Sequence, residues 1–220
     1  MQELAEPVEH LICRIKRIPV NARYFVALAG VPGAGKSTLA TRITALVNAS
    51  FLCESMVALG MDGFHLSRAA LAGFPDAAEA LARRGAPWTF DASGMAQRLR
   101  QLRRAAGYHG IGWPTFEHSI GDPVENGMVV PATVKLVLVE GLYLLHQMDG
   151  WEEVGRQFDE RWYLDTPLEL AMERLAHRHR EAWGISQAQA EARIAGNDGL
   201  NAEIVQRSRR NADYSVKSLA

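Results

Sequence analysis

Hydrophobic residues follow two kinds of pattern along the chain. Apolar runs without alternation occur at YFVALAG (24–30), MVALGMD (56–62) and VKLVLVEGL (134–142), a shorter run is RWYLD (161–165), and a weak one is DYSV (213–216). Unbroken apolar runs are typical of parallel strands that helices cover on both faces. Segments with helical periodicity lie between them, and this alternation predicts an α/β doubly wound parallel sheet with five core strands.

The spacing of apolar residues predicts one helix before the first strand and another directly after it. An amphipathic helix within residues 1–20 is expected to pack on the outside of the fold. The second helix is expected to turn four apolar side chains inward. The predicted inner residues are Leu4, Val8, Leu11, Ile12 and Ile15 in the first helix and Leu39, Ile43, Leu46 and Val47 in the second.

Capping residues predict where later helices begin and end. An Arg-rich helix is predicted near 92–105, capped by Asp91. A second helix is predicted to begin at the capping box Thr166-Pro167-Leu168-Glu169 and to end at Trp183-Gly184. A third is predicted to begin at the capping box of Ser186 and Gln189. The Arg-rich helix lies in a long insert between the second and third strands. A Gly/Pro-rich stretch from Gly107 to Pro131 follows it and is expected to be a long loop. Because long loops in compact domains are usually functional, we expect 91–131 to face the substrate.

Composition and charge narrow the classes of function. The 220 residues are 48% hydrophobic and 22% charged, which suits a single domain spanning 1–220. The formal net charge of -1 gives no basic field, so we expect no nucleic-acid partner. The N-terminus lacks signal-peptide features and no apolar run reaches membrane-spanning length, so we expect a cytoplasmic protein without membrane binding. Cys13 and Cys53, which form no CxxC pair, are expected to be buried thiols.

The stretch GVPGAGKS (30–37) has the spacing GxxxxGK[ST], directly after a predicted strand and before a predicted helix. Its glycines let backbone N–H groups point at phosphate oxygens, and the helix presents its positive end to the same anion. We expect Lys36 to reach the β- and γ-phosphates, the Ser37 hydroxyl to ligate Mg²⁺, and Thr38 to face the nucleotide. The expected ATP-binding residues are Gly30, Gly33, Ala34, Gly35, Lys36, Ser37 and Thr38.

Three carboxylates lie where predicted strands end, which is the edge at which parallel sheets bind ligands. Glu140 follows four apolar residues and can hold Mg²⁺ beside Ser37, directly or through water. Asp62 is placed to accept the proton of an incoming hydroxyl, and Gly63 after it permits a close approach of substrate. Asp165 precedes a capping box, so we predict a structural role for it.

These motifs resemble the uridine kinase, pantothenate kinase and phosphoribulokinase group of P-loop kinases, from about Ala22 to the C-terminus. The resemblance rests on GVPGAGKST, MDGFH, RRGAPWTFD (83–91), FEH (116–118), VEGLYLL and the strand at 161–165. Within this group, GAPxTFD and an ND..NA segment are similar to those of small bacterial proteins named as fructose transport system kinases. The segment is formed here by Asn197, Asp198, Asn201 and Ala202.

The resemblance implies a nucleoside-kinase-like P-loop fold with a helical lid at about 167–200. It implies that Asp62 is the catalytic base and that Glu140 lies on the magnesium side, next to the substrate. The arginines of the helix after the fourth strand would then form a mobile lid. Arg174 and Arg178 would share one face of that helix, at i and i+4, and offer positive charge to the migrating phosphoryl group.

His118 is implied as a substrate contact, but only through its place in the FEH triplet. Phe116 and Glu117 depart from the tyrosine and aspartate that uridine kinases place before this histidine. The NFDHP stretch of uridine kinases is also absent, and RRGAPWTFD stands in its place. Pantothenate kinases of the group have a longer chain. These departures weaken a nucleoside or a pantothenate assignment.

We therefore expect a kinase that uses ATP and Mg²⁺ to phosphorylate a hydroxyl of a small metabolite, a sugar such as fructose or a sugar-like polyol. Nucleoside or pantothenate kinase activity is the alternative. A P-loop GTPase switch is less favoured because no NKxD motif follows the fourth strand. A silent regulatory subunit is disfavoured by the presence of Lys36, Ser37, Asp62 and Glu140. The sequence leaves open whether the protein forms a homodimer.

Overall fold

A parallel sheet lies at the centre of the computed structural model, which describes residues 4–117 and 120–218. The strands are β1 (Tyr24–Ala29), β2 (Met56–Gly60), β3 (Ile111–Glu117), β4 (Asp122–Val130), β5 (Leu136–Gly141), β6 (Glu160–Asp165) and β7 (Tyr214–Lys217). The α-helices are α1 (Ala5–Arg17), α2 (Lys36–Asn48), α3 (Arg68–Ala72), α4 (Ala77–Ala82), α5 (Ala92–Arg104), α6 (Trp151–Gly155), α7 (Leu168–Trp183), α8 (Gln187–Arg193) and α9 (Gly199–Ser208). Short 3₁₀ segments are η2 (Met61–Phe64), η3 (Pro87–Thr89) and η5 (Arg209–Asn211), and η4 (Ile194–Asp198) is a π-helical turn.

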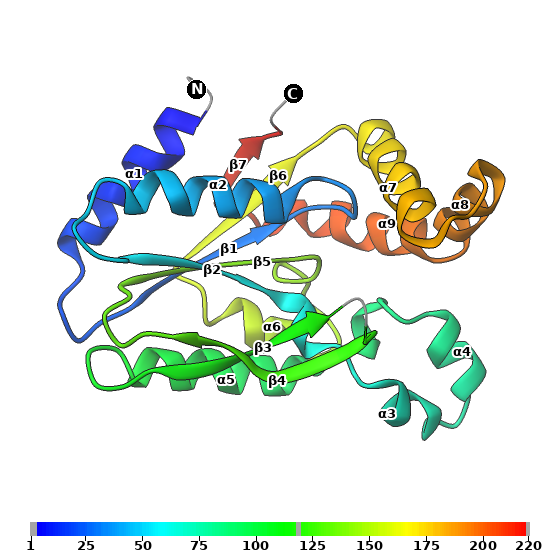
Figure 1. The fold of residues 1–220 in the computed structure, drawn as a ribbon, viewed down its shortest axis with the longest axis horizontal. Helices are drawn as coiled ribbons and strands as arrows, with labels where there is room; N and C mark the ends of the chain where they lie inside the picture. Colours follow the sequence, from blue (N-terminus) through cyan, green and yellow to red (C-terminus); the bar gives the residue numbers. More distant parts are fainter. Residues whose placement is uncertain (1–3, 118–119, 219–220) are drawn as a thin grey trace.

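The main sheet has the strand order β2-β5-β1-β6-β7, and each neighbouring pair is parallel. Helices α1 and α2 lie on one side of it and α5 and α6 on the other (Figure 1). The predicted doubly wound α/β class with five core strands is therefore confirmed. Because all five strands run the same way, their carboxyl ends share one edge, and α7, α8 and α9 lie beyond that edge.

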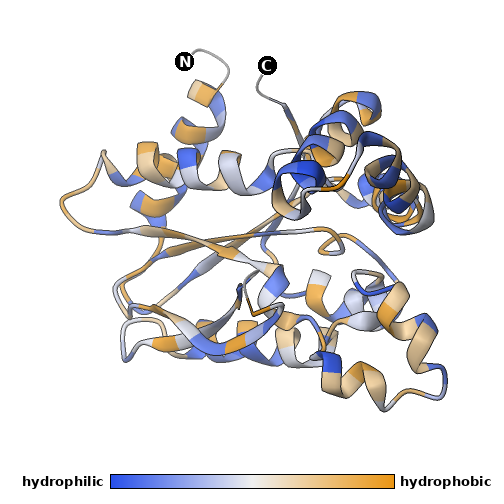
Figure 2. Cartoon of the chain, turned by 45° about the vertical axis from the view of Figure 1, so that its right-hand side comes forward, coloured by the Kyte–Doolittle hydropathy of each residue, from blue (hydrophilic) through white to orange (hydrophobic). Residues whose placement is uncertain are grey.

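The central strands are buried on both faces, which explains their unbroken apolar sequences. Residues Phe25–Ala29 of β1 and Leu136–Val139 of β5 are inaccessible to solvent. Figure 2 shows these strands coloured mainly as hydrophobic, whereas α7 and α8 alternate between hydrophobic and hydrophilic residues. Such alternation fits helices that pack by one face only.

The structure corrects three expectations about burial. Leu46 is 42% exposed, because it lies about 75° around α2 from the centre of the buried stripe formed by its neighbours Leu39, Ala40, Ile43 and Val47. Cys13 and Cys53 are both exposed rather than buried. Cys13 follows Leu11 by two residues, so it points away from the face of α1 that packs inward, and Cys53 lies in the connection between α2 and β2.

The Gly/Pro-rich stretch expected to be a loop is instead an antiparallel hairpin, formed by β3 and β4. Its strands contain the β-branched and aromatic residues that favour extended structure. Pro114 is tolerated because the pairing register shifts between Trp113 and Thr115, where a strand can dispense with an N–H donor. The buried Trp113 ties the hairpin to the main sheet by donating from its indole N–H to the Gly60 carbonyl at 2.9 Å.

The capping predictions are confirmed except at α7. Asp91 accepts from the Gly94 amide, Ser186 and Gln189 form a reciprocal capping box, and Gly184 ends α7 in the left-handed conformation. The box predicted at Thr166 is wrong, because Pro167 occupies the N-cap position and no side chain caps the helix. The Thr166 hydroxyl is engaged elsewhere.

Candidate active site

The loop between β1 and α2 presents backbone amides to the carboxyl edge of the sheet. The residue before α2, Gly35, adopts a left-handed conformation with φ 90°, and no side chain caps the helix. Gly35 offers no side chain to cap the amides of the first turn, and the positive end of the helix dipole lies at the same place. This geometry suits an anion such as a phosphate.

Close contacts fix the shape of this loop. A Cβ atom added to Gly33, whose φ is +76°, would lie 2.0 Å from the Ala171 carbonyl oxygen of α7. On the other side, the buried Thr166 hydroxyl donates to the Ala34 carbonyl at 3.1 Å. The loop is therefore held between the end of β6 and the first turns of α7, and Gly33 is needed there for both its conformation and its size.

Lys36, Ser37 and Glu140 meet at the start of α2. The Ser37 hydroxyl donates to Glu140 Oε1 at 2.8 Å, and Lys36 Nζ donates to the Val31 carbonyl at 3.1 Å. Burial lowers the pKa of the Lys36 ammonium, although the nearby charges of Glu140 and Asp62 oppose this shift. Burial also raises the pKa of the Glu140 carboxyl, and Lys36 opposes that shift. A hydroxyl beside a carboxylate is a suitable ligand pair for Mg²⁺.

Asp62 lies just beyond the end of β2 in η2, and its side chain is exposed. Its charge acts on both Lys36 and Glu140, so the three groups face one region. Gly63 has a different role from the one predicted. A Cβ atom there would lie 2.0 Å from the Pro114 carbonyl oxygen, so the close approach is made by β3 and not by a substrate. The hairpin therefore holds the turn that carries Asp62.

The two predicted lid arginines lie on the helix that contacts the phosphate-binding loop. The Arg174 guanidinium is close to the loop, because its Nη1 lies 3.9 Å from the place where a Cβ of Gly35 would be. Its Nη1 also approaches the Ser218 hydroxyl at 3.4 Å. Arg178 is near enough for its charge to act on both Lys36 and Glu140. Its charge adds to the lowering of the Lys36 pKa by burial and opposes the raising of the Glu140 pKa by burial. His118, the remaining predicted substrate contact, lies outside the described residues.

Sequence reasoning did not predict a cluster that joins the loop at 83–85 to residues 196–201. Arg83 reaches toward the Gly196 carbonyl and Asn201 Oδ1 at 3.4 and 3.5 Å, and the Asn197 side chain donates to the Arg84 carbonyl at 2.9 Å. These asparagines belong to the ND..NA segment and lie on and beside the π-helical turn η4. Turns of this kind are frequent at functional sites, but the hydrophobic pattern contains no signal for them.

Tyr143 connects this cluster to Asp62. Its buried hydroxyl donates to the Gly85 carbonyl at 2.5 Å, and burial raises its pKa. The charges of Arg83, Asp198 and Asp62 also act on that hydroxyl. Arg83 and Asp62 therefore both lie within electrostatic reach of the Tyr143 hydroxyl.

Comparison with known proteins agrees with this geometry. No protein-family model matches the chain. A "putative uridine kinase" of Schizosaccharomyces pombe is 34% identical over 199 residues, which cover 90% of this chain and 84% of the relative. An "ATP-dependent kinase-like protein" of Aspergillus versicolor is 39% identical over 153 residues, which cover 68% and 88%. This chain belongs to the uridine kinase-like group of ATP-dependent P-loop kinases.

A solved structure gives the same result for this kinase. The "putative fructose transport system kinase" from Silicibacter sp. TM1040 superposes with a TM-score of 0.84 at 30% identity, covering 96% of this chain and 98% of that one. The kinase uses ATP with Mg²⁺, and its residues fit both. The left-handed Gly35 brings no side chain to the start of α2, which suits phosphate oxygens, and Ser37 and Glu140 offer oxygen ligands for Mg²⁺. Within the described residues, no helix is both long enough and apolar enough to cross a bilayer.

Proposed function

We propose that this kinase transfers the γ-phosphoryl group of ATP to a hydroxyl of a sugar or sugar-like polyol. The observation that carries the proposal is the exposed carboxylate of Asp62, which lies at the same sheet edge as the phosphate-binding loop and within electrostatic reach of Lys36. A carboxylate in this place can accept the proton of an incoming alcohol. The name of the Silicibacter relative supports a sugar as the acceptor.

The residues of the phosphate-binding loop would hold the nucleotide. The amides from Gly30 to Thr38, with Gly33, Ala34 and Gly35 between them, would surround the phosphates, and the Lys36 ammonium would contact the β- and γ-phosphates. Ser37 and Glu140 would hold Mg²⁺, which would offset the negative charge of the phosphates.

Asp62 would act from the acceptor side. The acceptor oxygen attacks the γ-phosphorus while its proton passes to the Asp62 carboxylate, and the bond between the γ-phosphorus and the bridging oxygen of ADP breaks. The negative charge that grows on the departing ADP oxygen needs cations close by. Arg174 and Arg178 can supply them, since both lie on the helix that contacts the loop.

These roles assign each part of the chain to the outside of the fold, to the acceptor side or to the lid. In this proposal the single kinase domain spans 1–220, with the N-terminal helix in 1–20 on the outside. The insert at about 91–131 belongs to the acceptor side, since its hairpin packs on the turn that carries Asp62. The helices at about 167–200 form the lid, since α7 contacts the phosphate-binding loop and η4 contacts the loop at 83–85.

Acceptor-dependent release of ADP tests the proposal. A panel of sugars, polyols, nucleosides, hydroxy acids and pantothenate is offered to the wild-type protein and to Asp62→Asn, which keeps the size of the side chain and removes the base. We expect release with one or more sugars or polyols, a decrease of about 100-fold or more in Asp62→Asn, and unchanged ATP binding. Equal turnover in the variant would remove Asp62 from the mechanism.

A nucleoside acceptor is the second candidate, and the name of the Schizosaccharomyces pombe relative favours it. The same panel separates the two candidates. Release with uridine or cytidine and none with any sugar or polyol would replace the sugar proposal with the nucleoside one.

A further inference from the structure

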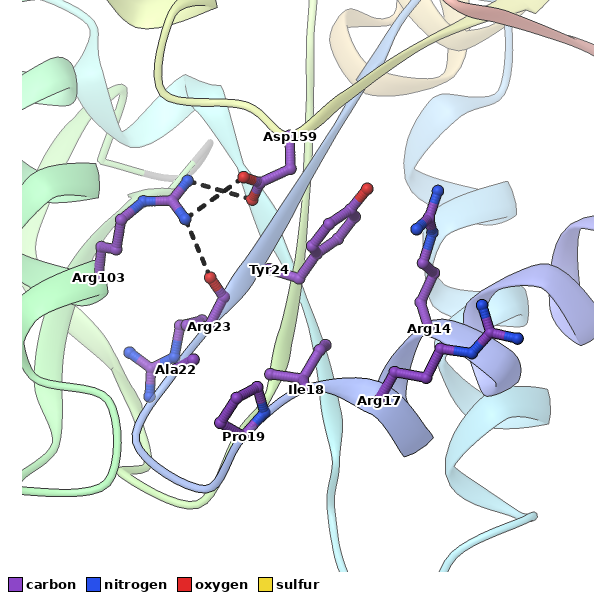
Figure 3. A pocket seen from close by; sticks show the side chains of 9 residues that line it. All are labelled: Arg14, Arg17, Ile18, Pro19, Ala22, Arg23, Tyr24, Arg103 and Asp159. Atoms are coloured by element: carbon purple, nitrogen blue, oxygen red, sulfur yellow. Dashed lines mark hydrogen bonds and ion pairs between the residues drawn. The ribbon is translucent and has the colours of Figure 1, made fainter.

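A cavity of about 270 Å³ lies at the end of the sheet opposite the phosphate-binding loop (Figure 3). It is formed where the end of α1, the start of β1, the end of α5 and the connection before β6 meet. The six residues of β1 separate it from the loop by about 20 Å. The cavity is therefore distinct from the candidate active site.

Positive charge dominates the wall of this cavity. Four arginines line it, whereas Asp159 is the only carboxylate among the lining residues; the full lining is Arg14, Arg17, Ile18, Pro19, Ala22, Arg23, Tyr24, Arg103 and Asp159. Asp159 is already engaged, because it accepts from Arg103 at 3.1 Å and from the Phe25 amide at 2.7 Å. Arg103 pairs with Asp159 and Arg14 pairs with Glu160, so Arg17 and Arg23 are left without a carboxylate partner among the described residues.

Arg23 contributes charge that no carboxylate in the described part of the chain neutralises. Its side chain is buried, and its guanidinium donates only to backbone carbonyls, those of Leu102, Pro131, Ala132 and Val134. Among the described residues, no carboxylate lies within ion-pairing distance of it. Burial lowers the pKa of Arg23, as expected for a cation whose charge is uncompensated. An anion in the adjoining cavity would compensate it.

The opposite wall offers groups that could contact a ligand directly. Arg17 ends α1 and is exposed, and it makes no hydrogen bond or ion pair with any residue in the described part of the chain. Arg14 lies over the Tyr24 ring at 5.4 Å and pairs with Glu160 at the rim. In Figure 3 these two arginines lie on one side of Tyr24, and Arg23 and Arg103 on the other. Guanidinium groups on two sides suit a ligand with more than one anionic group.

We propose that this cavity binds a small polyanion bearing phosphate or carboxylate groups. Arg17 and Arg103 would contact its anionic groups, Arg23 would add long-range attraction, and Ile18 and Pro19 would cover its apolar part. Such a ligand would bind independently of the nucleotide.

Calorimetric titration of the full chain in Mg²⁺-free buffer tests this proposal, with pyrophosphate and citrate as probes and ionic strength held constant. The variants are Arg17→Glu, which reverses an exposed charge in the cavity wall, and Lys16→Glu, which makes the same reversal one residue away on an exposed side chain outside it. Lys36→Ala weakens binding at the phosphate-binding loop. Hydrogen exchange then locates the bound probe.

We expect at least one probe to bind with its affinity lowered about tenfold or more by Arg17→Glu and changed little by Lys16→Glu or Lys36→Ala. Exchange should slow at 14–24 and 157–160. Binding of pyrophosphate alone indicates a phosphate-specific site, and binding of citrate alone indicates a carboxylate-specific site. Binding of both probes indicates a general anion site. The proposal is overturned if neither probe binds at millimolar concentration, if only Lys36→Ala weakens binding, or if the two charge reversals weaken it equally.

Discussion

Gly33→Ala measures the contact between the phosphate-binding loop and α7, because the added methyl group would meet the Ala171 carbonyl oxygen at 2.0 Å. Two costs add up. An alanine at φ +76° costs about 1–2 kcal/mol relative to glycine. A contact so far below ordinary van der Waals distance also forces α7 or the loop to shift, and overpacking of this kind costs about 1–3 kcal/mol.

Gly184→Ala is the matched control. Gly184 has a similar φ of +63°, but a Cβ atom there would meet nothing within 4 Å. It therefore bears the conformational cost alone, about 1–2 kcal/mol. The difference between the two variants isolates the contact with α7, which we expect to be worth about 1–3 kcal/mol.

Urea denaturation of the nucleotide-free protein gives the free energy of unfolding for both variants and the wild type. Gly33→Ala should lower it by about 2–5 kcal/mol, and its melting temperature should fall clearly further than that of Gly184→Ala. Nucleotide-free protein is essential, because loss of ATP binding would otherwise be counted as loss of stability. If the two variants unfold with equal free energies, α7 does not rest on the loop, and the lid proposed above has a different position.

Two further predictions concern the surroundings of the site, and a third concerns an ion pair at the start of β6. Thr166→Val leaves the Ala34 carbonyl without its side-chain donor, so we expect a loss of about 1–2 kcal/mol in unfolding free energy and a raised KM for ATP, with Thr166→Ser near wild type. Arg83→Gln should raise the KM for the acceptor and leave that for ATP unchanged, and equal rises would place Arg83 elsewhere. Arg161 donates to both oxygens of Asp213 and holds the pKa of that carboxyl below its usual range. The stabilisation is therefore present above the unfolded pKa of about 4 and is lost as the pH falls through the lower folded value. Because both side chains are well exposed, it amounts to about 0.5–1 kcal/mol, and Asp213→Asn should abolish this part of the acid dependence of urea denaturation.

The sequence alone was sufficient to predict those elements whose signal lies within a few neighbouring residues. The unbroken apolar runs predicted the five strands of the main sheet, and the GxxxxGK[ST] spacing predicted the loop between β1 and α2. The caps at Asp91 and at Ser186 were also predicted, because each bond joins residues three apart. Physical rules that act within a few residues can be read from the chain alone.

The remaining features depend on contacts between residues far apart in the sequence. The hydroxyl of Thr166 has capping-box spacing, yet it bonds to Ala34, 132 positions away. Gly63 appears to make room for a ligand until β3 is placed against it. Arg83 looks like one of many surface arginines until Gly196 and Asn201, more than 100 positions away, are placed beside it. None of these contacts has a periodic signal, so tertiary structure was needed to find them.

The packing of Pro114 on Gly63 implies that donor and acceptor chemistry can change separately in this fold. The groups assigned to ATP come from β1, α2, β5 and α7, whereas the turn of Asp62 is held by the hairpin of β3 and β4. Exchanging residues 111–130 between related kinases would therefore reshape the space beside Asp62 while the elements proposed to hold the nucleotide stay intact. Evolution could diversify acceptors by the same route, keeping one phosphate-holding loop for many alcohols.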